Sequence, residues 1–280
     1  MARTCIVTGS NGYVGSCVVR AFARAGWRVV EMTRAAKPDA IPFRLGENVP
    51  VESLAGADAL VHCAYDFKQV TRDEIRATNV RGAEKLFDAA TRAGVAKLVC
   101  ISTISAFDGC NSLYGQAKLE IEKIATRHGA LVIRPGLVWG DHPGGMLGKL
   151  KAQVEKSKVV PLIGDGTQIQ YLVHDEDLCG FIERHCSGGV ESVGDPITAA
   201  NEMPWKFRDV LAAIAAQRGK SPMFVRLPWR AIWLALKVAE ILGARLTFRS
   251  DSVISLMNPN PAPSFAGARA AGLRCRPFNP

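Results

Sequence analysis

A tyrosine and a lysine four positions apart, Tyr114 and Lys118, are the residues of this sequence best suited to proton transfer. Residues 113–128 have helical periodicity, and side chains four positions apart share one face of a helix. A free tyrosine has a pKa of about 10 and is a poor base at neutral pH, but a nearby ammonium group favours the phenolate and lowers that pKa. The pair could therefore exchange a proton with a substrate hydroxyl. Taken alone, it could also be a solvent-exposed pair on a helix surface.

Hydroxyl side chains that precede this pair could orient a substrate oxygen by a hydrogen bond. The candidates are Ser102, Thr103 and Ser105, which follow an apolar run typical of a buried strand. Their residue types and spacing leave open which of them does so.

A second feature that points to chemistry is a glycine-rich turn, Gly9-Ser10-Asn11-Gly12-Tyr13-Val14-Gly15, between an expected strand and an expected helix. In such a turn the glycines permit a positive φ, let a pyrophosphate approach the backbone and let the helix pack close to the strand. The free N–H groups at the helix start can then bind phosphates. Small turns also collect glycine for other reasons, but this position favours dinucleotide binding.

The elements that would position these residues alternate along the first half of the chain. Apolar, β-branched runs predict strands, and 3.6-residue periodicity predicts helices. After about residue 140 the pattern changes to glycine and proline clusters with shorter elements. We therefore expect an α/β fold, a doubly wound parallel (Rossmann) sheet over 1–140, and a smaller substrate-binding region over 141–280 that partly returns to the sheet. Strands are expected at 4–8, 27–33, 41–45, 59–63, 96–102 and 130–134, and helices at 13–25, 71–92 and 113–128.

Six short motifs follow one another in a fixed order from about residue 3 to 180: 8–15 (TGSNGYVG), 79–82 (NVRG), 101–103 (IST), 114–118 (YGQAK), 134–140 (RPGLVWG) and 172–178 (LVHDEDL). Together they resemble the extended form of the short-chain dehydrogenase/reductase superfamily, also called the NAD-dependent epimerase/dehydratase family. The resemblance implies an NAD(P)-dependent oxidoreductase or epimerase that passes a hydride between nicotinamide and a secondary alcohol or ketone carbon.

The resemblance also implies roles for individual residues. Tyr114 would be the acid/base, Lys118 would lower its pKa and bind the nicotinamide ribose, and Thr103 would place the substrate oxygen, with Ser105 in reserve. Asn79 would be a buried residue that supports the site from a helix, although it could also be a plain helix-start residue. Cofactor contacts are expected from Gly9, Asn11, Gly12, Tyr13, Val14, Gly15, Thr33, Arg34, Leu45, Ala64, Tyr114, Lys118 and Pro135.

The end of the second strand bears on the choice of nicotinamide cofactor. An acidic residue there binds the ribose 2′-hydroxyl of NAD, whereas a nearby arginine accommodates the 2′-phosphate of NADP. Here the position of the acid is Thr33 and the next residue is Arg34, which favours NADP with NAD as the alternative. Glu31, on the same strand face as Thr33, could instead substitute for the acid.

The substrate class stays open at the level of the sequence. Leu137 occupies a position where nucleotide-sugar enzymes of the family often have asparagine, and this R-P form looks more like reductases and hydroxysteroid-type dehydrogenases. A nucleotide-sugar epimerase or dehydratase is the first alternative. A redox-inactive dinucleotide sensor or scaffold is the second, although relatives of that kind usually lose the Tyr or the Lys.

An apolar segment with two tryptophans, 227–242, is a further candidate element. It could be a lid over an apolar substrate or a helix on a membrane surface. It could also be a helix buried in the second region or at a homodimer contact, and the sequence favours this second interpretation.

Composition sets the remaining limits. The 280 residues include 35 Lys and Arg against 26 Asp and Glu, a formal net charge of +9, but no block of basic residues that would indicate nucleic acid. No apolar run reaches the roughly 18 residues of a membrane span, and no His or Cys spacing indicates a metal. The eight scattered cysteines suggest reduced thiols in a cytoplasmic protein.

Overall fold

The computed structural model has a parallel sheet at its centre and describes residues 2–34, 37–141, 144–190, 196–244, 246 and 248–280. The sheet has seven strands in the order β11-β6-β5-β4-β1-β2-β3, and every neighbouring pair is parallel. From β1 the chain first builds outward to one edge and then to the other, which is the doubly wound order. The predicted fold class is thereby confirmed. The strands are β1 (Thr4–Thr8), β2 (Arg28–Thr33), β3 (Ile41–Pro42), β4 (Ala59–His62), β5 (Lys97–Ile101), β6 (Leu131–Pro135) and β11 (Ile197–Ala199).

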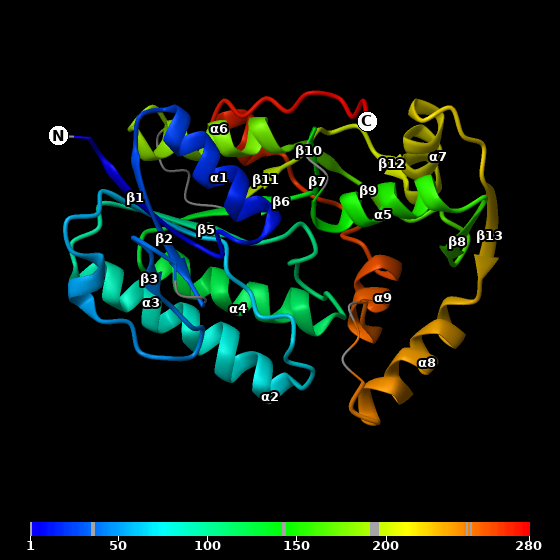
Figure 1. The fold of residues 1–280 in the computed structure, drawn as a ribbon, viewed down its shortest axis with the longest axis horizontal. Coiled ribbons are helices and arrows are strands. Elements are labelled where there is room, and N and C mark those ends of the chain that lie inside the picture. Colours follow the sequence, from blue (N-terminus) through cyan, green and yellow to red (C-terminus); the bar gives the residue numbers. More distant parts are fainter. Residues whose placement is uncertain (1, 35–36, 142–143, 191–195, 245, 247) are drawn as a thin grey trace.

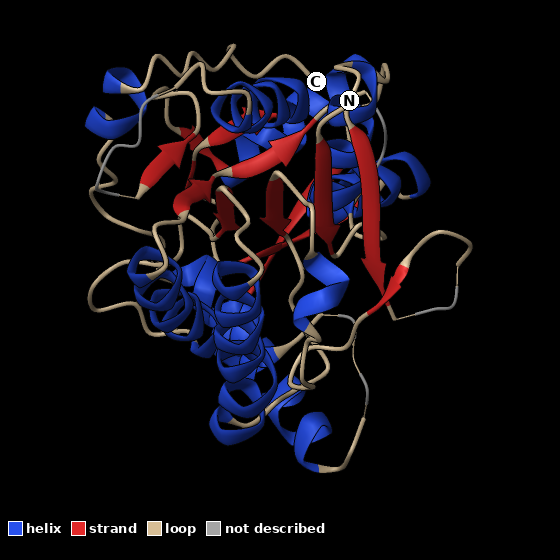
Figure 2. Cartoon of the chain, turned by 90° about the vertical axis from the view of Figure 1, so that its left-hand side faces the viewer, coloured by secondary structure: helices blue, strands red, loops and turns tan. Residues whose placement is uncertain are grey.

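Helices cover both faces of this sheet, so the strands form a middle layer (Figure 2). Because both faces are covered, the strands are apolar on both sides, and each face has its own buried core. One face carries α1 (Tyr13–Arg24), α6 (Asp175–Cys186) and α10 (Ala266–Ala270). The other carries α2 (Arg72–Ile75), the π-helical turn η2 (Arg76–Val80), α3 (Arg81–Arg92), α4 (Leu113–Arg127) and the 3₁₀ turn η1 (Val51–Leu54).

Part of the second half of the chain forms a lobe beside the sheet (Figure 1). Its three strand pairs form a third core with two helices, to which Leu256 and Phe278 from later in the chain also belong. Two further helices, α8 and α9, lead from this lobe back toward α4. The elements are β7 (Leu137–Trp139), α5 (Gly145–Lys156), β8 (Val159–Ile163), β9 (Ile169–Gln170), β10 (Leu172–His174), β12 (Trp205–Lys206), α7 (Phe207–Gln217), β13 (Met223–Leu227), α8 (Trp229–Ile241) and α9 (Ser250–Met257).

Three expected elements differ in detail. The strand expected at 41–45 ends at Pro42, and the next N–H, of Phe43, still bonds the Thr33 carbonyl while its ring enters the core. The long helix expected at 71–92 begins with a capping box between Thr71 and Glu74, but it contains a π-helical turn. The helix expected from Leu227 starts at Trp229, because Leu227 ends a strand that pairs with β8.

All eight cysteines are free thiols. Six of them are buried, and Cys63 and Cys275 are partly buried. Burial is the main cause that raises the pKa of every one of these thiols, for example to about 12 for Cys63, Cys100 and Cys275.

Candidate active site

The glycine turn lies between the carboxyl end of β1 and the start of α1. Gly9 has a φ of +68°, and a Cβ there would lie 2.7 Å from the backbone nitrogen of Ala64. A Cβ on Gly15 would lie 2.2 Å from the Gly9 carbonyl oxygen. Gly12 is the N-cap of α1, no side chain caps this helix, and its first turn contains no acidic residue. Gly9 and Gly15 are thus required by close packing of backbone within the protein, and the uncapped N–H groups at the start of α1 fit the pyrophosphate of a dinucleotide.

At the end of β2, Thr33 stands where the acid that binds the NAD ribose is expected, and the Glu31 carboxyl, two residues earlier, interacts with Lys37 and with Ser10 of the glycine turn. Thr33 is buried and Arg34, the next residue, is exposed. Glu31 is bound by the Lys37 ammonium, and this contact lowers the pKa of the Glu31 carboxyl. If Glu31 bound the ribose in place of the missing acid, it would have to do so while paired with Lys37 or give up that ion pair.

The three predicted catalytic side chains lie together at the carboxyl edge of the sheet. Tyr114 is in the first turn of α4, and Thr103 lies two residues beyond β5. Burial raises the pKa of Tyr114 to about 12, and a hydrogen bond from the Thr103 side chain acts in the opposite direction. Burial thus prevails over the lowering of this pKa expected from Lys118. The phenol keeps its proton at neutral pH, as an acid requires.

Lys118 is buried one helical turn after Tyr114. Its ammonium donates to the Ile101 carbonyl oxygen at 2.8 Å and lies 5.2 Å from the centre of the Tyr65 ring. Burial lowers the pKa of Lys118, while Cys100, Cys63 and Glu122 oppose that shift. This hydrogen bond holds the Lys118 ammonium at the carboxyl end of β5, the edge of the sheet at which cofactor binding is expected.

Two of the three hydroxyl candidates can now be distinguished. Ser102 is buried and donates to the Glu122 carboxylate. Arg134 donates to both oxygens of the same carboxylate, from Nε to Oε1 at 2.8 Å and from Nη2 to Oε2 at 2.6 Å. Ser102 is thus committed to a structural network, whereas the Thr103 hydroxyl bonds the Ser105 N–H at 3.2 Å and faces Tyr114.

Asn79 holds the loop that follows β4. Its side chain is buried, accepts from the Asp66 N–H at 2.7 Å and donates to the Asp66 carbonyl at 3.1 Å. Asn79 lies in the π-helical turn, and such turns are frequent at functional sites. Asn79 is therefore buried on a helix and holds the backbone of the loop that contains Asp66.

Two aromatic residues of the loop that Asn79 holds form one wall of the site. Apart from their place after Ala64, no sequence pattern indicated them. The Tyr65 ring meets the Tyr114 ring edge-on at 4.9 Å, and the Phe67 ring lies 5.5 Å from Tyr114. Phe67 is 60% exposed. The Tyr114 ring is consequently bordered by two aromatic rings, and one of them, Phe67, is largely exposed to solvent.

The C-terminal segment clamps the catalytic helix. Asp251 of α9 accepts from the N–H groups of Leu113 at 2.7 Å and Tyr114 at 3.0 Å. The neighbouring Arg249 donates to the Phe67 carbonyl at 2.8 Å and also bonds the Gln69 carbonyl. Residues 137 positions apart thereby meet, and nothing in the sequence pattern of 250–257 predicts this contact.

The remaining expected cofactor residues border the same edge. Ala64 bonds the Thr8 hydroxyl through its N–H at 3.3 Å, and Pro135 accepts from Ile104 at 3.0 Å. Leu45 packs against Gly82 at the start of α3, and Asn11 is exposed in the glycine turn. Val14 lies on the first turn of α1. These positions surround the carboxyl ends of β1, β4 and β6.

Tyr13 differs, because its side chain faces the second lobe. Its hydroxyl donates to Asp175 at 3.0 Å, and its ring lies where a Cβ on Gly144 would stand. Burial, followed by the Asp175 charge, raises the pKa of Tyr13. Only the backbone of Tyr13 is therefore placed to serve a cofactor.

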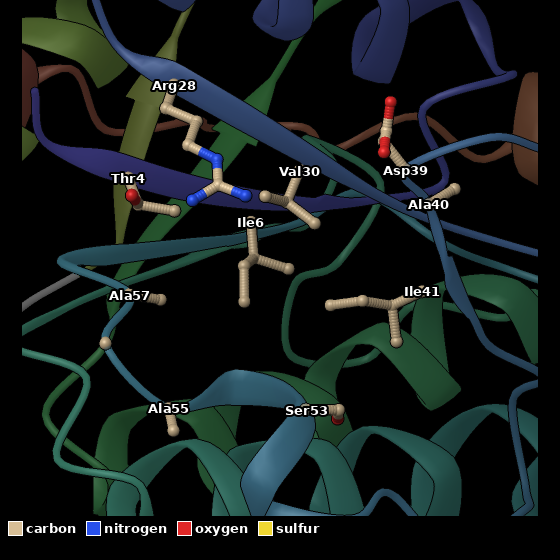
Figure 3. A pocket seen from close by; sticks show the side chains of 11 residues that line it. Thr4, Ile6, Arg28, Val30, Asp39, Ala40, Ile41, Ser53, Ala55 and Ala57 are labelled. Atoms are coloured by element: carbon tan, nitrogen blue, oxygen red, sulfur yellow. The ribbon is translucent and has the colours of Figure 1, made fainter.

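A cavity of about 320 Å³ lies elsewhere, beneath β1 and β2 and beside η1. Figure 3 shows Ile6 and Val30 between Arg28 and Asp39. The cavity begins at Thr4 and Arg28, the first residues of their strands. It is separate from the carboxyl edge that carries Gly9 and Tyr114.

Comparison with known proteins identifies the family. A family model described as the NAD dependent epimerase/dehydratase family matches residues 5–186. The chain belongs to this family. It is thus an enzyme of the extended short-chain dehydrogenase/reductase type, as its motifs predicted.

Relatives in this family cover several activities. A ceramide reductase of Caulobacter vibrioides is 25% identical over 79% of this chain and 73% of that protein. A dTDP-glucose 4,6-dehydratase of Streptomyces griseus is 27% identical over 72% of this chain and 76% of its own length. DesIV, a dTDP-glucose 4,6-dehydratase of Streptomyces venezuelae solved with NAD and TYD bound, superposes with a TM-score of 0.70 at 19% identity, over 98% of this chain and 92% of its own. This last likeness shows the shared fold.

No helix in the described part of the chain combines the length and hydropathy needed to cross a membrane.

Proposed function

We propose that this enzyme catalyses NADP-dependent oxidation and reduction at a secondary alcohol or ketone carbon, with Thr103, Tyr114 and Lys118 as its catalytic residues. The observation that carries the proposal is the Tyr114 hydroxyl, paired with Thr103 at the sheet edge beside the glycine turn. A nicotinamide cofactor supplies hydride exchange at its C4 atom when bound.

In the reductive direction, Tyr114 would act as the acid. The carbonyl oxygen would accept hydrogen bonds from Thr103 and Tyr114, and the Tyr114 proton would pass to that oxygen as the carbon gains hydride. The raised pKa of Tyr114 keeps this proton available at neutral pH. Oxidation of an alcohol would need the phenolate, which the Lys118 ammonium and a positively charged nicotinamide would both favour.

NADP is proposed over NAD on the strength of Arg34. A guanidinium can hold a phosphate dianion by two hydrogen bonds, and Arg34 is exposed just after the strand end. Glu31, the nearest carboxylate on the same strand, is held by Lys37. Solved neighbours such as MoeE5 contain NAD, so the preference requires direct measurement.

The cofactor proposal is tested by titrating NADPH and NADH and following nicotinamide fluorescence. We expect tighter binding of NADPH, and about a tenfold loss in Arg34→Ala, which corresponds to about 1.4 kcal/mol. Arg92→Ala, at an exposed arginine that ends α3, is the matched control. Equal affinities, or tighter NADH, would refute the assignment to Arg34.

The substrate class is tested by a panel of acyl-chain ketones, steroid ketones and nucleotide sugars. The apolar wall of Tyr65 and Phe67, together with Leu137, favours less polar ketones, and relatives include a ceramide reductase and a 3 beta-hydroxysteroid dehydrogenase of Mycobacterium tuberculosis. The second candidate, a nucleotide-sugar epimerase or dehydratase, is supported by MoeE5, which was solved with UDP-glucose. Turnover of nucleotide sugars alone would select it.

The catalytic proposal is tested by Tyr114→Phe, which removes the transferred proton and should lower kcat by about 10²- to 10⁴-fold while NADPH still binds. Tyr171→Phe is the matched control, since the Tyr171 ring packs against Phe265 and makes no ring contact with Tyr65, Phe67 or Tyr114 in the described part of the chain. Undiminished turnover in Tyr114→Phe would refute Tyr114 as the acid/base. Cofactor binding without turnover of any substrate in the wild type would instead favour a dinucleotide sensor.

The compartment follows from the thiols. Eight free cysteines suit a reducing environment, and we propose the cytoplasm.

A further inference from the structure

Helix α8 presents an apolar face to solvent. None of its residues is buried, so the expectation of a helix buried within the second region is wrong, while the homodimer contact named with it stays a prediction. Leu234, Val238 and Ile241 are 56%, 47% and 75% exposed, and Leu242, which follows the helix, is 80% exposed. Their three- and four-residue spacing puts them on one side of the helix.

The opposite side of α8 is occupied by contacts within the molecule. Trp229, Ile232, Trp233 and Leu236 are half-buried, and the main neighbour of the helix is α9. Figure 1 shows α8 extending away from the sheet, with α9 between it and α4. Helix α8 is thus apolar on two sides: one side packs within the molecule, mainly against α9, and the other is exposed to solvent.

The exposed charged residues of α8 are both cations. Positions 218–249 contain seven Arg and Lys residues and a single acid, Glu240, but Arg218 pairs with Glu155 and Arg249 bonds backbone carbonyls. The Glu240 carboxylate is turned inward, where it accepts from the Ser250 N–H at 2.8 Å and from the Ser250 hydroxyl at 2.7 Å. Arg230 and Lys237 are exposed beside the apolar residues. The cationic border of the apolar face therefore consists of Arg230 and Lys237.

We infer that α8 docks on the surface of an anionic lipid bilayer, with its apolar face in the interface and Arg230 and Lys237 at the headgroups. Exposed aliphatic side chains bordered by cations are the combination that binds helices to such surfaces. A second copy of the chain fits less well, because two such cationic borders would face each other. The surface also adjoins the site: Arg249, after α8, bonds the carbonyl of Phe67, whose ring contacts Tyr114.

The test is sedimentation of the full-length protein with vesicles of phosphatidylcholine, alone or mixed with phosphatidylglycerol. We expect binding to the mixed vesicles only, weakening as salt is raised. Leu234→Glu/Ile241→Glu and Arg230→Glu/Lys237→Glu should each weaken it about tenfold or more. Two controls match these changes: Met203→Glu, at an exposed methionine elsewhere, and Lys149→Glu/Lys156→Glu, at exposed lysines of α5.

Two outcomes would overturn the inference. One is failure to bind phosphatidylglycerol vesicles, or equal binding by the Leu234→Glu/Ile241→Glu variant. The other is a dimer in sedimentation velocity that this variant dissociates, with no vesicle binding by the wild type, which would assign the face to a second copy. Circular dichroism checks that each variant is folded, and neither result depends on catalytic turnover.

Discussion

At the scale of single residues, the structure distinguishes two hydroxyl side chains between which residue type and spacing alone could not decide. Ser102 and Thr103 are adjacent, but Ser102 faces the buried Glu122 and Thr103 faces Tyr114. Successive residues of an extended chain point to opposite sides, so one serves the core and the other the site.

This difference predicts that substitutions at the two positions affect different properties, the rate at one and the stability at the other. Thr103→Ala should lower kcat by about 10²-fold, because a hydrogen bond to the substrate oxygen is lost, and Thr103→Ser should restore most of the rate. Ser102→Ala should leave kcat nearly unchanged but lower the free energy of unfolding by about 1–3 kcal/mol, because a buried carboxylate loses a donor. Steady-state kinetics and urea unfolding separate the two. A larger kcat loss in Ser102→Ala would reverse the assignment.

At the scale of elements, the amino end of α4 is held from two sides. Ser112 accepts from the Gly115 N–H at 3.1 Å as the N-cap. Asp251 of α9 accepts two further N–H groups of the first turn. A carboxylate at this end also suits the helix dipole. The direction of the Tyr114 side chain therefore depends on a helix that lies far along the chain.

Asp251→Asn is expected to lower kcat about tenfold, because the isosteric amide loses both the charge and one acceptor, and a small displacement of a catalytic group has large effects. The affinity for NADPH should change little. Asp209→Asn, in the exposed first turn of α7, controls for the lost charge. If NADPH affinity fell as much as kcat, Asp251 would have a general structural role and would not be a positioning residue for Tyr114.

Local and long-range contacts explain how far the sequence could predict these elements. Strands such as β1 and the helix starting after Thr71 follow from periodicity and a capping box, which are local signals. The π-helical turn at Asn79 and the Asp251 clamp depend on side chains that meet only in the folded chain. The Tyr65 and Phe67 wall belongs with them, because loops carry no periodic pattern.

At the scale of the whole molecule, the two halves of the chain are joined around α1. Asp175, at the start of α6, accepts from the Tyr13 hydroxyl and from the Cys17 thiol at 3.3 Å. Trp27 donates to Glu183 of α6 at 3.1 Å. Strand β11 adds the later chain to the sheet edge beside β6. The cofactor turn is thus supported by residues from both halves.

Acid should destabilise the whole molecule through His62. This side chain is buried in β4 with Nδ1 2.8 Å from the Thr8 hydroxyl, and burial, with a smaller effect of Lys118, lowers its pKa to about 3. Between that value and the unfolded value of 6.5, the unfolded chain binds the extra proton, so stability falls as pH falls. The loss at about pH 5 should be about 2 kcal/mol.

The measurement is urea unfolding of the wild type and His62→Asn at about pH 8 and pH 5. The variant should lose less stability between the two pH values, by about 2 kcal/mol. The comparison isolates His62 from His185, whose pKa burial also lowers. An identical pH dependence in both proteins would contradict the prediction.

The raised pKa that all eight thiols share has a practical consequence for spectroscopy. A thiol with a raised pKa holds almost no thiolate at neutral pH, and the thiolate is the form that reacts with maleimides and iodoacetamides. The native protein should therefore stay largely unlabelled by such reagents. A single exposed cysteine, introduced for example as Lys237→Cys on α8, would then carry a fluorophore or spin label at one known place, without removing any of the eight natural cysteines.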